Sequence, residues 1–95
     1  EAAAKRFRWT ERRRAASPRE GVGIACGTEK GSFVAACAAV HVETDGTIKV
    51  DEVCQAYECG AIHNPANLLA QVEGCLIMGL GGALREEIHF SAGKV

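Results

Sequence analysis

Apolar residues alternate with other residues most regularly between positions 33 and 44. One side of an extended strand there would carry Val34, Ala36, Ala38, Val40 and Val42. Asp45-Gly46 follows, a dipeptide typical of a two-residue type I′ turn, and Ile48 begins a returning strand. The pattern predicts an antiparallel hairpin built from residues 33–44 and 47–58.

The alternation in the returning strand slips by one residue after Val50, because the next apolar residue is Val53 rather than Glu52. One extra residue near Asp51 and Glu52, a β-bulge, would restore the pattern as far as Tyr57. We therefore predict a bulge at this point of the strand.

A longer apolar stripe with helical spacing runs through residues 65–84. Its members recur at intervals of three and four residues: Leu68, Val72, Leu76, Leu80 and Ala83. Asn64 is a favoured N-cap, and Pro65 suits the first helical position because its missing N–H would have no partner there. Four glycines in this helix each cost about 0.5–1 kcal/mol relative to Ala. They indicate that another backbone or a ligand approaches the helix closely.

The flanking segments complete an α+β fold. Residues 1–14 are strong helix formers that end before Ser17-Pro18, and we expect residues 20–28 and 85–90 to be strands. We predict a small, mostly antiparallel sheet of three to four strands with the long helix packed on one face. The N-terminal helix would lie at an edge of the sheet or reach a neighbour. The predicted core joins Leu68, Val72, Leu76 and Leu80 of the helix to Val34, Val40, Ile48 and Val53 of the sheet.

Length and composition indicate a single soluble domain over residues 1–95. Hydrophobic residues make up 47% and charged residues 24%, and no uninterrupted apolar run approaches the roughly 18 residues of a membrane span. We therefore expect no membrane partner. The start of the chain shows no signal peptide, so we expect a bacterial cytoplasmic or periplasmic location.

The charge is uneven along the chain. Residues 1–20 hold seven Lys or Arg and three Glu, whereas the remainder holds four basic residues and nine acids. The basic arm, residues 5–19, is either a solvated helix that pairs with acids elsewhere or a site for nucleic acid or another acidic partner. The first reading is favoured, because Trp9 is the only large aromatic ring close to Arg12-Arg13-Arg14.

Spacing alone predicts no catalytic residue and no metal ligand. The five cysteines are odd in number and contain no C-x-x-C pair, which argues against a disulfide framework and a zinc site. Cys59 and His63 come closest to a nucleophile and its base, but we expect a turn between them, which keeps the two side chains apart. By local chemistry the chain holds no self-sufficient active site.

Two long segments nevertheless resemble one enzyme family. The string AYECGAIHNPANLLAQVEGCLIMGLGGALREEIHF is similar to the segment D/E-C/V-G-x-x-x-N-P-x-x-x-x-x-Q-x-E-G-x-x-x-x-G-L-x-x-A-L in large subunits of molybdenum hydroxylases, the xanthine dehydrogenase and aldehyde oxidase superfamily. Upstream, GVGIACGTEKGSFVAACAAVHVETDGTIKV resembles the corresponding stretch of the isoquinoline 1-oxidoreductase beta subunit. The resemblance extends over most of the chain.

The resemblance implies a cofactor and two cofactor-binding residues. Large subunits of this superfamily bind molybdopterin, often as the cytosine dinucleotide, and hydroxylate heteroaromatic rings or aldehydes with oxygen from water. Gln71 stands at the glutamine of the Q-x-E-G motif, whose amide binds the pterin in relatives, and Gly74 would let the cofactor approach closely. Without the resemblance, Gln71 would be read as a polar residue on the solvent side of an amphipathic helix.

The same resemblance shows what these residues lack. Relatives carry a Gly-x-x-G-Gln-Gly segment beside the molybdenum and a C-terminal Gly-Glu that supplies the catalytic base, and neither occurs here. We therefore expect an internal piece of a large subunit, or a small free-standing relic of one, that is inactive by itself and binds no cofactor alone. Its partners would be the remainder of the large subunit and an iron–sulfur subunit. The alternatives are a structural module that forms homo-oligomers through exposed edges, and, less favoured, a binder of nucleic acid through the basic arm.

Overall fold

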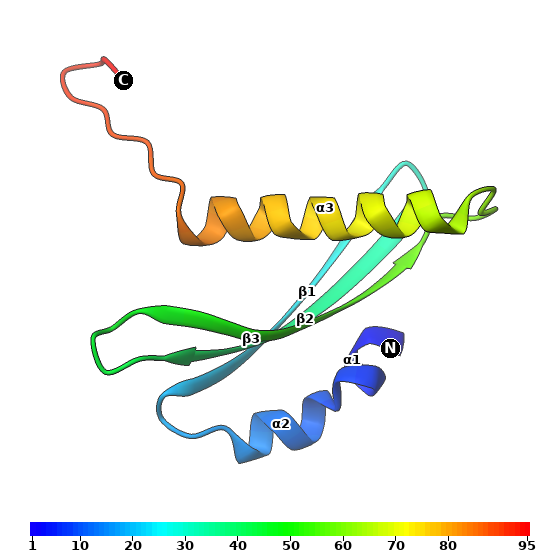
Figure 1. Ribbon diagram of the computed structural model, residues 1–95, viewed down its shortest axis with the longest axis horizontal. Coiled ribbons are helices and arrows are strands. Elements are labelled where there is room, and N and C mark those ends of the chain that lie inside the picture. The colour runs from blue at the N-terminus through cyan, green and yellow to red at the C-terminus, as the bar shows by residue number, and fades with distance from the viewer. The chain divides into compact units, whose positions relative to one another are not determined.

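The computed structural model describes residues 1–95, which form two compact units, Glu1–Ala61 and Ile62–Val95. The first unit contains two short helices and three strands: α1 (Ala2–Phe7), α2 (Trp9–Ala15), β1 (Glu20–Glu29), β2 (Ser32–Val42) and β3 (Ile48–Glu58). The second unit contains one long helix, α3 (Pro65–Leu84) (Figure 1). These elements confirm the predicted α+β class, with three strands in the sheet.

The three strands form one antiparallel sheet in the order β1-β2-β3. In the centre of the sheet, Cys37 of β2 lies opposite Ile24 of β1 and Cys54 of β3. Since side chains alternate between faces, this register defines two faces. The alanine face carries Val22, Ala35, Cys37, Ala39, Cys54 and Ala56, and the valine face carries Val34, Val40, Val42, Ile48, Val50, Val53 and Tyr57.

The register between β2 and β3 shifts once, and the shift confirms the predicted bulge. Ala39 pairs with Glu52, but the next residue, Val40, pairs with Val50. Asp51 is therefore the extra residue of β3. Without it, a valine on one side of the bulge would fall on the wrong face of the sheet.

The type I′ turn of this sheet joins β1 to β2. Its two central residues, Lys30 and Gly31, have φ angles of 50° and 82°, and this turn type requires positive φ at both positions. Gly31 adopts such a conformation without steric cost, because it has no Cβ.

The type I′ turn predicted at Asp45-Gly46 was wrong. In the β2–β3 connection the Gly46 N–H donates to the Glu43 carbonyl at 3.1 Å, and Gly46 alone has a positive φ, 89°. The Asp45 carboxylate accepts a hydrogen bond from the Thr47 N–H at 2.9 Å. This side-chain bond stabilises a wider loop than the two-residue turn.

The N-terminal segment forms two helices rather than the single helix expected over residues 1–14. Arg8 separates them, with a φ of 57° and a ψ of 44° in the left-handed region. A non-glycine residue there costs about 1–2 kcal/mol, but the break accompanies the complete burial of Phe7 (0% exposed). Burying such a side chain contributes about 1.5–3 kcal/mol, which offsets the strain at Arg8.

The core of the first unit lies between α1 and the alanine face. Ala3, Phe7 and Cys37 are its buried residues, and small partly buried side chains of the sheet surround them. The expectation that the N-terminal helix lies at an edge or reaches a neighbour was therefore wrong. Alanine and cysteine let α1 approach the strands closely, whereas the bulkier valine face is not covered by α1 or α2.

The second unit confirms the predicted bounds and N-cap of the long helix. The Asn64 side chain accepts a hydrogen bond from the Asn67 N–H at 3.0 Å, and Pro65 is the first helical residue. Along α3 the half-buried leucine and valine side chains are the predicted ones: Leu68, Val72, Leu76 and Leu80. The packing of this stripe against Val34, Val40, Ile48 and Val53 stays a prediction.

The strand predicted over residues 85–90 is not formed. The N–H groups of Arg85 and Glu86 both donate to the Gly81 carbonyl, at 2.9 and 3.2 Å, so the chain leaves α3 with its donors turned back onto the helix. The last residues form a tight turn in which Ser91 and Lys94 exchange backbone hydrogen bonds of 2.9 and 3.0 Å.

Candidate functional site

The sequence-predicted cofactor residues lie on one side of α3. Asn67, Gln71, Gly74 and Met78 follow one another at intervals of three and four residues, which places them in a row along the helix. At 100° per residue, this row lies roughly opposite the stripe that begins at Leu68. α3 therefore presents two different faces, one aliphatic and one that carries amides and a glycine.

Gln71 and Gly74 are both exposed on this row. The Gln71 amide forms no hydrogen bond in the structure, so its two N–H donors and its carbonyl acceptor are free for a ligand. At Gly74 no heavy atom lies within 4 Å of the position that a Cβ would occupy. The space beside the glutamine is open.

α3 exposes more apolar surface than a helix in water ordinarily does. Ile77 and Met78 are 68% and 77% exposed, and Leu69 is 58% exposed. By length and composition α3 meets the requirement for crossing a membrane, as do core helices of soluble proteins. Exposed apolar side chains of this size, beyond the aliphatic stripe, are typical of a surface that another molecule or segment covers.

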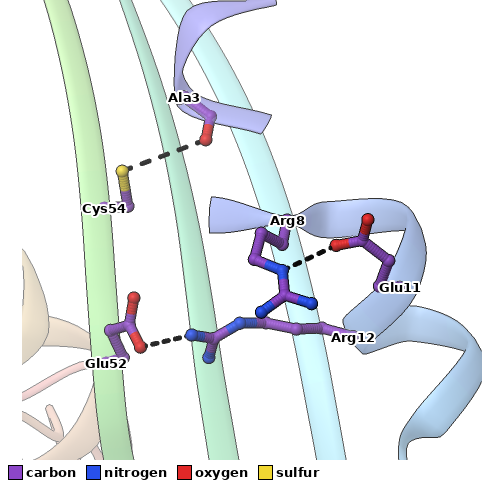
Figure 2. A network of polar contacts seen from close by, with 6 residues as sticks. All are labelled: Ala3, Arg8, Glu11, Arg12, Glu52 and Cys54. Carbon is purple, nitrogen blue, oxygen red and sulfur yellow. Dashed lines mark hydrogen bonds and ion pairs between the residues drawn. The ribbon is translucent and has the colours of Figure 1, made fainter. Parts of the chain in front are cut away.

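A second group of polar residues attaches α2 to the sheet (Figure 2). The Arg12 guanidinium donates to the Glu52 carboxylate of β3 at 2.5 Å and lies 4.5 Å from the centre of the Phe7 ring. One turn earlier, Arg8 Nε donates to Glu11 at 2.9 Å. Two arginines of the basic arm thus pair with carboxylates, as the solvated-helix reading of the arm expects.

Next to this pair, a groove of about 230 Å³ lies between α2 and the sheet, lined in part by Arg12, Glu20 and Asp51. The Ser17 backbone N–H donates to the Glu20 carboxylate at 3.0 Å, and this hydrogen bond lowers the pKa of Glu20. The ionised form of Glu20 is therefore favoured at the mouth of the groove.

His41 forms a cluster with two carboxylates that the sequence analysis did not identify. Its Nδ1 lies 2.7 Å from Asp51 Oδ1, and its Nε2 lies 3.5 Å from Glu43 Oε1. The hydrogen bond to Asp51 raises the pKa of His41, and the charges of Asp51 and Glu43 act in the same direction. The signal was present in the sequence, since the bulge that aims Asp51 at His41 was predicted there.

The cysteines form no disulfide and no metal-binding group, and the separation of Cys59 from His63 stays a prediction. All five cysteines are free thiols, and no group of three or more His, Cys, Asp or Glu side chains is placed to hold a metal ion. Burial raises the pKa of the Cys37 thiol, with Cys54 and Cys26 contributing in the same direction. A raised pKa makes this thiol a poor nucleophile.

Comparison with known proteins identifies the family. Residues 27–95 match the family model described as the molybdopterin cofactor-binding domain, and the chain belongs to this family. This makes it part of a molybdenum-cofactor oxidoreductase. No curated protein and no solved structure matches the chain. The matched segment includes all of α3, and with it Gln71 and Gly74.

The free groups on α3 fit the chemistry of molybdopterin. A pterin edge presents hydrogen-bond donors and acceptors side by side, and a primary amide such as that of Gln71 offers both. The open space at Gly74 leaves room for a flat ring system beside the amide.

Proposed function

We propose that residues 1–95 are an internal piece of the large subunit of a molybdenum hydroxylase of the xanthine dehydrogenase and aldehyde oxidase superfamily. Within it, the isoquinoline 1-oxidoreductase branch is the one whose sequence pattern the first half of the chain resembles. In this proposal α3 is a helix that contacts the cofactor, and the catalytic base comes from another part of the enzyme.

The unengaged amide of Gln71 is the observation that carries the proposal. It stands in a Q-x-E-G motif within the segment that matches the cofactor-binding family, and Gly74 one turn later leaves its surroundings open. The exposed apolar residues of α3 add support, because they require further protein or a large ligand as cover.

The cofactor supplies the molybdenum centre at which a heteroaromatic ring or an aldehyde gains oxygen from water. The residues of this chain hold and orient it. The Gln71 amide would donate to and accept from the pterin edge, and Gly74 would permit close approach. The apolar side chains of α3 would exclude water around the ring system. We further propose the cytosine dinucleotide form of the cofactor, an iron–sulfur subunit as electron acceptor, and a bacterial cytoplasmic or periplasmic location.

The experiment that tests this proposal is cofactor analysis of the complete large subunit that contains this segment. We expect Gln71→Ala to lower the molybdenum and pterin content per subunit several-fold, because removal of the amide leaves polar groups of the pterin unpaired. Asn67→Ala is the matched control, since it removes an exposed amide one turn earlier on the same row. Equal cofactor content in both variants and the wild type would contradict the role of Gln71. Nucleotide analysis of the extracted cofactor distinguishes the cytosine form from others.

A non-enzymatic oligomerisation module is the second candidate function. It is favoured by the open edge of β1, which has no partner strand. A role in nucleic-acid binding gains no comparable support, since Arg8 and Arg12 of the basic arm are already paired with carboxylates.

A further inference from the structure

We propose that two copies of this chain pair through their β1 strands, antiparallel and about a two-fold axis at Ile24, with Arg19 of each copy opposite Glu29 of the partner subunit. This inference rests on the second candidate function, because both start from the open edge of β1. Its failure would leave the cofactor role of Gln71 untouched, since that role is tested by cofactor content.

The two edges of the sheet differ in how well they are protected against pairing. β3 carries the bulge at Asp51, and charged residues such as Lys49 and Glu52 lie along it. Bulges and charges are the features that prevent edge strands from joining other strands. β1 has neither between Gly21 and Gly27, where every residue is uncharged and none is proline.

The hydrogen-bond pattern shows which groups of β1 lack a partner. Val42 N–H donates to the Arg19 carbonyl at 2.8 Å, so the backbone of Arg19 faces β2. In an antiparallel ladder this orientation alternates along the strand. The N–H and C=O groups of Val22, Ile24, Cys26 and Thr28 therefore point away from the sheet without a partner. At Glu20 only the C=O is open, because its N–H donates to the Ser17 carbonyl at 3.0 Å.

This alternation restricts the register in which two β1 strands can pair. Outward-facing residues must lie opposite outward-facing residues, which excludes the register that would place Glu20 opposite Glu29 of the partner subunit. Among the allowed registers, the one centred on Ile24 pairs residues 20–28 of the two strands, and it leaves Arg19, the residue just before β1, at the end of the ladder. It places Arg19 opposite Glu29 of the partner subunit at both ends of the ladder, so the charges are complementary.

The side chains of β1 suit this register on both faces. Ile24 is 47% exposed although it lies in the middle of a strand, and on the two-fold axis it would pack against its own copy. Val22 would lie opposite Cys26 of the partner subunit on the same face, another apolar pair. On the opposite face the residues between the charges are glycine and alanine, which present no obstacle.

The charged residues at the ends are free to take part. Arg19 forms no ion pair within the chain, and Glu29 approaches only Lys30, at 3.6 Å with both side chains at least 80% exposed. Such an exposed contact is weak and easily exchanged. Two pairs between opposite charges at the ends of the ladder would fix its register.

Sedimentation equilibrium of the 95-residue chain under reducing conditions tests the proposal. The wild type should show a monomer–dimer equilibrium. Arg19→Glu and Glu29→Arg should each weaken dimerisation by about tenfold or more, since each replaces two attractive pairs by two repulsive ones. The double variant R19E/E29R should restore it, because the charges are exchanged but remain complementary. Lys49→Glu on β3 is the control, and it should leave the equilibrium unchanged.

Mixing the R19E and E29R variants tests the same charge pairs without a double variant. In a mixed dimer the carboxylate introduced by R19E would meet the guanidinium introduced by E29R at one end of the ladder. The other end would keep the original pair of arginine and glutamate, so the mixture should dimerise better than either variant alone. Higher salt should reduce these differences through screening.

Three results would overturn the proposal. The first is a wild type that remains a monomer at about 1 mM, a concentration at which even weak association is measurable. The second is a failure of both the double variant and the mixture to recover dimerisation. The third is a loss of dimerisation in K49E as large as that in R19E.

Discussion

Phe7 of α1 packs with Cys37 of β2, and these are the two largest side chains with no exposed surface in the first unit. The contact joins a helix at the N-terminus to the central strand of the sheet. At this contact α1 covers the alanine face, because the small side chains of Ala35, Ala39 and Ala56 leave room for the Phe7 ring.

Phe7→Ala should therefore destabilise the first unit strongly. Loss of a buried phenylalanine costs about 3–5 kcal/mol, through lost burial and the cavity that remains. The matched control is Phe33→Ala, since Phe33 is 58% exposed and should cost far less. Urea unfolding followed by circular dichroism measures both. Similar unfolding midpoints for the two variants would contradict the packing of α1 on the sheet.

The cysteines should differ in their rates of alkylation. Cys37 is buried, so the reagent does not reach it, and its raised pKa keeps the thiol protonated. Cys26 and Cys75 are exposed. Under native conditions and limiting iodoacetamide, mass spectrometry should find Cys26 and Cys75 modified first and Cys37 last. In urea the five rates should converge. Early modification of Cys37 in the folded chain would show that α1 leaves the sheet readily.

The His41 cluster should make stability depend on pH. The pKa of His41 is higher in the folded chain than in the unfolded chain, where this pKa is about 6.5. Its contribution is therefore fully present below that value and is lost as the pH rises through the raised pKa. Glu20 lies opposite His41 on β1 and favours the same protonated form, whereas Lys49 opposite it on β3 disfavours that form.

The measurement compares urea midpoints at acidic and alkaline pH for the wild type and His41→Gln. The wild type should lose more stability than His41→Gln between the two conditions. Asp51→Asn should reduce the difference as well, since Asp51 makes the largest contribution to the raised pKa. An identical pH dependence in all three proteins would exclude the cluster as its source.

Replacement by alanine should have different effects at Gly31, in the β1–β2 turn, and at Gly23, within β1. Gly31→Ala should cost about 1–2 kcal/mol, because it forces a Cβ into the left-handed region. Gly23→Ala should be tolerated, since φ at Gly23 is not positive and no heavy atom lies within 4 Å of the added Cβ. Thermal unfolding of both variants is the test. A neutral Gly31→Ala would indicate that the β1–β2 turn is not of type I′.

Much of the fold follows from patterns within short segments of the sequence. The predictions that were wrong concern places where contacts between distant residues determine the backbone conformation. The Asn64 cap and the bulge at Asp51 were predictable, since each depends on residues next to it in sequence. The break at Arg8 was not predictable, because it is stabilised by the burial of Phe7 against strands that lie later in the chain. Lys30 gives no turn signal of its own, so the type I′ turn was placed at the more typical Asp45-Gly46.

The candidate site divides in the same way. Periodicity placed Gln71 on a helix, and the structure confirms that helix, but only the family resemblance gave the residue a role. The His41–Asp51 contact needed the bulge to be combined with the strand register, and periodicity alone does not make that connection.

The aliphatic stripe of α3 is predicted to cover the valine face of the sheet. Both surfaces are apolar, and within the first unit α1 and α2 cover only the alanine face, so the valine face still requires a partner. If the stripe is that partner, Leu76→Lys should lower the thermal stability of the sheet, because it would bury a charge against valines. Ile77→Lys is the matched control, since this neighbouring residue lies off the stripe and is 68% exposed. Amide exchange of β2 should accelerate in the first variant and not in the second, and equal exchange in both would rule out this packing.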